Sequence, residues 1–141
     1  MFGCGGLSSA PSTPVTPPPP KSNVTVSYLE KLYAVNNEAY FQNKLPKVIT
    51  IELSEERDMA TTFCNGSGNC IIKFNLRYTA AERVADFTIL HEMCHVKVWG
   101  KEEDDLGQEV AHGRLWRSCM LQLDQAGAFR EIIIDGYREA N

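Results

Sequence analysis

The feature that most constrains this chain is the pentapeptide His-Glu-Met-Cys-His at residues 91–95. Two histidines four positions apart lie on one face of an α-helix, about one turn from each other, so their imidazoles can bind one tetrahedral zinc ion. The glutamate between them lies beside such a metal, where it can accept a proton from a zinc-activated water. The spacing therefore predicts that His91 and His95 bind zinc and that Glu92 is a catalytic base.

The residues around this motif predict that its helix is buried. Between Asp86 and Lys97, Glu92 is the only residue with a permanent charge, and most of the others are apolar. A carboxylate in an apolar helix is costly unless a cation or hydrogen bonds compensate it. A metal site provides that compensation. The alternative is a helix that merely carries the two histidines and the glutamate at its rim.

A third metal ligand is expected elsewhere in the chain, because a catalytic zinc site has three protein ligands and one open position for water. The chain has three histidines, and the last, His112, follows an acidic stretch and precedes a glycine that allows close approach. We predict His112 as the third ligand because zinc favours imidazole. The alternative ligands are the carboxylates of the acidic stretch: Glu102, Glu103, Asp104, Asp105 and Glu109.

The hydrophobic pattern predicts an α+β fold in which a small three-stranded sheet, antiparallel or mixed, packs against the HExxH helix and further helices. We expect capping boxes at Ser27 with Glu30 and at Thr79 with Glu82. The tail after Gly127 is ambiguous and slightly favours a helix. The predicted elements are a helix over 25–42, strands over 47–53, 59–64 and 70–74, the HExxH helix over 80–99 and a helix over 112–125.

A chain of 141 residues is expected to form one domain. Residues 1–22 are rich in proline and serine and predict a disordered leader, which leaves residues 23–141 as the folded domain. The surroundings of Cys4, Phe-Gly-Cys-Gly-Gly and a Ser/Pro tether, resemble the processed end of a bacterial lipoprotein, although no apolar stretch precedes them. The expected location is therefore the cytoplasm, with an extracytoplasmic lipoprotein anchored through Cys4 as the alternative. We expect a monomer.

The other four cysteines fall into two groups. Cys64 and Cys70 flank a five-residue turn, so they can face each other across paired strands and form a disulfide if the protein leaves the cytoplasm. Two reduced thiols or a metal-binding pair are the alternatives. Cys94 and Cys119 are predicted to be small core residues.

The motif H-E-M-C-H, a loop and then H-G-x-x-W at the start of a helix resemble the SprT-like family of zinc metallopeptidases, which includes the protease domain of Spartan. A helix ending in the run at residues 39–46, a strand and a hairpin also fit, so the resemblance covers residues 28–127. It implies a zincin-like fold, zinc on His91, His95 and His112, and Glu92 as the base. Family members typically carry a proline where this chain has Arg114.

The predicted function is a zinc-dependent metallopeptidase that hydrolyses peptide bonds in a protein or peptide substrate. One alternative is a DNA-associated protease that acts on crosslinked proteins, and the other is a non-catalytic zinc-binding module. Many family members add a cysteine zinc ribbon or DNA-binding segments, which this sequence does not contain. The formal net charge of −4 also weighs against nucleic acid as a partner.

Overall fold

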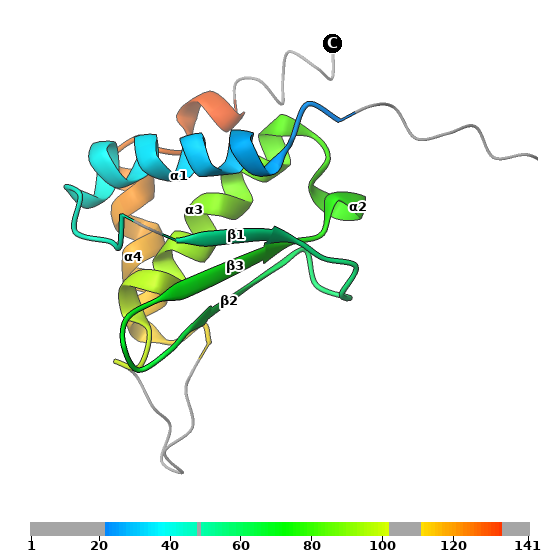
Figure 1. The fold of residues 1–141 in the computed structure, drawn as a ribbon. Coiled ribbons are helices and arrows are strands. Elements are labelled where there is room, and N and C mark those ends of the chain that lie inside the picture. Colours follow the sequence, from blue (N-terminus) through cyan, green and yellow to red (C-terminus); the bar gives the residue numbers. More distant parts are fainter. Residues whose placement is uncertain (1–21, 48, 102–110, 134–141) are drawn as a thin grey trace, which may run out of the picture.

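The computed structural model describes residues 22–47, 49–101 and 111–133. They form a three-stranded sheet that is covered by helices (Figure 1), which confirms the predicted α+β architecture. The elements are α1 (Val26–Phe41), β1 (Thr50–Leu53), β2 (Ala60–Cys64), β3 (Cys70–Phe74), α2 (Leu76–Thr79), α3 (Glu82–Val98) and α4 (Arg114–Gln125).

The sheet is mixed, with strand order β1-β3-β2. β3 pairs in parallel with β1 and antiparallel with β2, and its residues Ile72 and Phe74 are fully buried. β2 and β3 form a hairpin whose turn is stabilised by Asn65, because its side-chain oxygen accepts hydrogen bonds from the backbone N–H groups of Ser67 and Asn69. Because β2 stands last in the strand order, it forms one edge of the described sheet.

Helix α3 is the centre of the domain, since it packs against α1, α4 and β2 (Figure 1). Its burial agrees with the apolar sequence around the HExxH motif, and Glu92 itself is only 4% exposed. Gly100, with a φ of 67°, follows the helix at the position predicted to stop it. The buried residues of α3 are Ala85, Thr88, Ile89, Leu90, Glu92, Met93, Cys94, Val96 and Val98.

Both predicted capping boxes are wrong. The N-cap of α1 is Thr25, whose side chain accepts a hydrogen bond from the Tyr28 N–H at 3.1 Å, so the helix begins before Ser27. Thr79 ends the short helix α2, where its hydroxyl donates to the carbonyl of Asn75 at 3.0 Å. Helix α3 begins only at Glu82, and its N-cap is Ala81, whose side chain makes no capping hydrogen bond.

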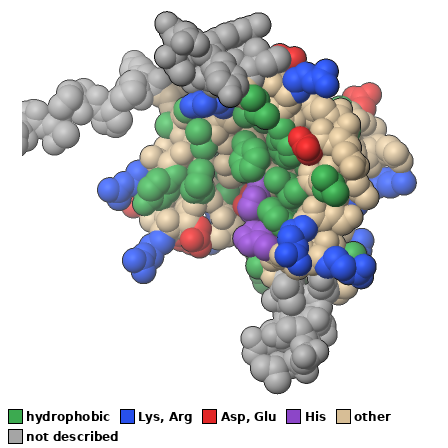
Figure 2. Space-filling view, turned by 180° about the vertical axis from the view of Figure 1, so that it is seen from behind, with side chains coloured by type: hydrophobic (Ala, Val, Ile, Leu, Met, Phe, Trp, Pro, Cys, Tyr) green, Lys and Arg blue, Asp and Glu red, His purple; other side chains and the backbone are tan. Residues whose placement is uncertain are grey.

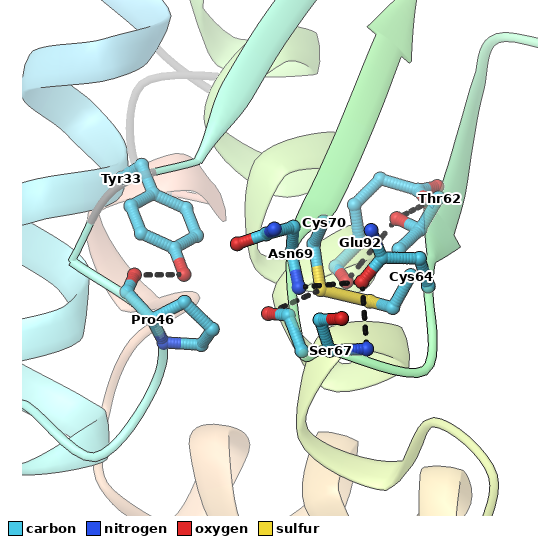
Figure 3. The surroundings of a disulfide bond; sticks show 10 residues. Tyr33, Pro46, Thr62, Cys64, Ser67, Asn69, Cys70 and Glu92 are labelled. Carbon is cyan, nitrogen blue, oxygen red and sulfur yellow. Dashed lines mark hydrogen bonds between the residues drawn. A yellow bond between two sulfur atoms is a disulfide. The ribbon is translucent and has the colours of Figure 1, made fainter.

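Two disulfides connect the elements. Cys64 and Cys70 face each other in the β2–β3 register, with a Cα–Cα distance of 4.0 Å, and form the pair that the sequence suggested (Figure 3). Cys94 on α3 pairs with Cys119 on α4 at a Cα–Cα distance of 5.8 Å. Cys94 and Cys119 are both buried, as predicted, but the disulfide between them was not predicted. Two cysteines 25 positions apart in different helices are brought together only by the packing of those helices.

The chain ends are described only in part. Residues 130–133 are helical, in agreement with the slight preference for a helix in the tail. Most of the leader, the acidic stretch at 102–110 and the last eight residues lie outside the described part. Within that part, each helix is too short or too polar to cross a membrane.

Candidate metal centre

The structure brings the three histidines together. His91 and His95 lie one turn apart on α3, and His112 directly precedes Gly113, the N-cap of α4. The Nε2 atom of His95 is 3.3 Å from that of His91 and 3.2 Å from that of His112, and the third side of this triangle is also 3.2 Å. The three imidazoles thus point to a single place. The alternative carboxylate ligands at 102–105 and 109 lie outside the described residues.

This triangle has the dimensions of a metal site. Nitrogen ligands at 2.0–2.1 Å from a tetrahedral zinc lie about 3.3–3.4 Å from one another, which matches the observed spacing. Hydrogen bonding cannot account for all three contacts, because each neutral Nε2 is either a donor or an acceptor and at least two of the three atoms must therefore have the same role. The three side chains could therefore hold one metal ion.

The protonation state of the histidines also favours the binding of a metal cation. Burial, with a smaller contribution from the nearby His112, lowers the pKa of His91 to about 4. Burial likewise lowers the pKa of His95 to about 4, with contributions from both other imidazoles. At neutral pH these two rings are uncharged, and the neutral ring is the form that binds metals.

Trp116 of α4 packs against all three imidazoles. The distances from its ring centroid to those of His91, His95 and His112 are 4.7, 5.6 and 4.4 Å. Its indole N–H also donates a hydrogen bond to the backbone carbonyl of His91 at 3.3 Å. The sequence indicated Trp116 only as part of the H-G-x-x-W pattern, and the structure adds that it connects α4 to the histidines of α3.

Glu92 lies beside the histidines but is fixed by a residue that the sequence did not indicate. Its Oε2 accepts a hydrogen bond of 2.6 Å from the Thr62 hydroxyl on β2 (Figure 3). Its Oε1 is 3.9 Å from His91 Nε2. The pKa of Glu92 is raised to about 7, chiefly by burial; the hydrogen bond from Thr62 opposes this rise, and the charge of Asp58 adds to it. A cation bound next to the carboxylate would lower that pKa.

The site opens to solvent in a cleft of about 460 Å³. The edge strand β2 contributes one wall through residues 60–62, and Trp99, just after α3, contributes to another. Figure 2 shows histidine side chains reaching the surface among hydrophobic side chains. A molecule from solution can therefore reach both the histidines and Glu92.

A buried helix with two histidines and a glutamate, a third histidine before the next helix and a small mixed sheet define a domain with a candidate metal centre. The chain belongs to the SprT-like family, whose model matches residues 29–137. A search of curated proteins and a search of solved structures each found no match.

Proposed function

We propose that this protein is a zinc-dependent metallopeptidase in which His91, His95 and His112 bind the zinc and Glu92 is the general base. The observation that carries the proposal is the meeting of three Nε2 atoms within 3.2–3.3 Å of one another, next to a buried carboxylate in an open cleft. Membership of the SprT-like family, which is associated with metallopeptidase-like domains, supports it.

The metal site and Glu92 have different roles in the proposed reaction. Zinc at the three histidines would supply a Lewis acid that activates water and polarises the scissile carbonyl. Glu92 takes a proton from the attacking water and passes it to the leaving amine. Burial raises its pKa to about 7 in the metal-free site, and a bound cation would lower that pKa again, which keeps the carboxylate ionised and able to accept the proton at neutral pH.

Strand β2 is the element of the cleft that we propose binds the substrate. Within the described sheet it pairs with β3 alone, so its other edge offers backbone groups next to the histidines. An extended peptide can add to such an edge as a further strand. This arrangement would place the scissile bond beside Glu92 and supports a protein or peptide as the substrate.

The replacement Glu92→Gln tests the mechanism. Glutamine is nearly isosteric but cannot accept the proton, so we expect the rate of hydrolysis of an unfolded protein to fall more than about a hundredfold. Zinc content should stay the same. Glu131→Gln, an exposed substitution of the same kind, is the control and should keep full activity. An undiminished rate in Glu92→Gln would contradict the assigned base.

The same assay separates the two other functions. Hydrolysis that requires added single-stranded DNA would favour a DNA-associated protease. Stoichiometric zinc without any hydrolysis dependent on Glu92 would favour a non-catalytic zinc-binding module.

We also propose that the domain works in an oxidising compartment outside the cytoplasm, as the lipoprotein that the residues around Cys4 resemble would. The disulfides Cys64–Cys70 and Cys94–Cys119 support this, because such bonds persist where the surroundings are oxidising. Thiol trapping in cells that produce the protein should find these four cysteines oxidised. Four reduced thiols would favour the cytoplasm instead.

A further inference from the structure

We propose that Thr62 is a positioning residue for the general base, holding one oxygen of Glu92 so that the other faces the histidines. The inference rests on the proposed function and names a residue of β2 that acts through Glu92. Thr62 Oγ1 lies 2.6 Å from Oε2 of Glu92 (Figure 3). The other oxygen, Oε1, lies 3.9 Å from His91 Nε2.

The length of the contact indicates a strong hydrogen bond. A distance of 2.6 Å falls in the range of hydroxyl donors to a charged carboxylate, about 2.5–2.7 Å. A glutamate side chain has several rotatable bonds, and Glu92 is almost completely buried, so a protein donor rather than bulk water orients its carboxylate. With Oε2 occupied, Oε1 remains available to accept a proton from a water in the cleft.

Thr62 is itself held firmly. It lies opposite Ile72, a fully buried residue of the central strand, and two positions before the Cys64–Cys70 disulfide. Its branched Cβ further restricts the rotation that would move the hydroxyl away. The strand that we propose binds the substrate therefore also orients the base.

Three substitutions test this role in the complete chain. Thr62→Val keeps the shape but removes the donor, and Thr62→Ser keeps the donor. Thr88→Val is a matched control, because Thr88 is buried on α3 one turn before Glu92 and its hydroxyl donates to the Val84 carbonyl at 2.7 Å. All three variants should contain as much zinc as the wild type.

We expect Thr62→Val to lower kcat by about 10- to 100-fold with KM changed by less than about twofold, as found when residues supporting a metal site are removed. Thr62→Ser should restore kcat to within about threefold of the wild type, and Thr88→Val should leave it unchanged. An unchanged kcat in Thr62→Val, or no restoration by serine, would overturn the proposal. If Thr62→Val does not fold, Thr62→Ala takes its place under the same criteria.

A second measurement reads the contact without activity. In protein carrying ¹³C-labelled glutamate, the carboxyl NMR signal of Glu92 is the one that disappears in Glu92→Gln. In both metal-free and zinc-loaded protein this signal should move in Thr62→Val and stay in place in Thr62→Ser and Thr88→Val. A signal that stays in place in Thr62→Val would show that the hydroxyl does not hold the carboxylate, and would overturn the proposal. If the wild type and Glu92→Gln are equally inactive, the metallopeptidase proposal fails and the kinetic role of Thr62 fails with it.

Discussion

The two halves of the candidate metal centre are held in different ways. His91 and His95 are four positions apart in one helix, so the helix alone sets their spacing. His112 follows 17 residues after His95 and reaches the other two only because α4 packs on α3. The first half is therefore encoded locally, whereas the second depends on contacts between helices.

Helices α3 and α4 differ in how much of each is buried, and this difference explains why the contacts between them matter. α3 is surrounded by α1, α4 and the sheet, whereas in α4 the buried residues are Cys119 and Leu123. Three connections from α4 to α3 compensate for this: the Trp116 hydrogen bond to His91, the Cys94–Cys119 disulfide, and the hydrogen bond from Lys97 to Gln122 at 3.1 Å. Breaking them should affect the α4 half without disturbing the α3 half.

The largest effect is expected from removing a ligand from either half. His95→Ala and His112→Ala should each lower zinc affinity by more than about a hundredfold, because removal of a ligand costs more than the 10–100-fold typical of its supporting partners. Competition with a chelator and elemental analysis would measure the loss, with Glu131→Gln as the control.

The comparison of the two ligand variants is informative in itself. If His112→Ala kept stoichiometric zinc while His95→Ala lost it, the third ligand would be a carboxylate. The α4 half would then not belong to the metal centre.

What the sequence predicted follows the same division between local and non-local structure. The HExxH helix, its burial, its end at Gly100 and the three strands were predicted, because periodicity and turn residues depend on neighbours in the chain. His112 was found by counting histidines against the needs of zinc, and the structure places it beside the other two. Its role as a ligand stays a prediction.

The features that were missed depend on contacts between distant segments. The hydrogen bond from Thr62 to Glu92 joins residues 30 positions apart, and no local pattern distinguishes Thr62 from its neighbour Thr61. The parallel pairing of β1 with β3 is likewise set by packing. The wrong caps are a different case, because several hydroxyl residues near each helix start could serve and the sequence does not rank them.

The second largest effect that we expect is a loss of stability, which should differ between the two disulfides. In the chain-entropy model, a bond across 25 residues stabilises the fold by about 3.5 kcal/mol and one across 6 residues by about 2 kcal/mol. Replacing Cys94 and Cys119 together with alanine should therefore lower the free energy of unfolding more than replacing Cys64 and Cys70, as measured by denaturant titration.

Zinc affinity gives a sharper distinction between the same two variants. The Cys94–Cys119 bond holds the helix that follows His112, so its loss should weaken zinc binding about tenfold, whereas loss of the hairpin bond should not. Equal zinc affinity in both variants would mean that α4 is held adequately by its other contacts.

The smallest effect is expected from Trp116→Phe. Phenylalanine keeps an aromatic ring against the histidines but cannot donate the hydrogen bond to the His91 carbonyl. We expect a loss of about 1 kcal/mol in stability and zinc affinity lowered by up to about tenfold. Trp99→Phe is the control, since the Trp99 ring packs against Phe63 rather than the histidines, and its zinc affinity should not change. If the two variants bound zinc equally well, the indole N–H would contribute nothing to the alignment of α4, and the Cys94–Cys119 disulfide and the Lys97–Gln122 hydrogen bond would be the connections that position His112.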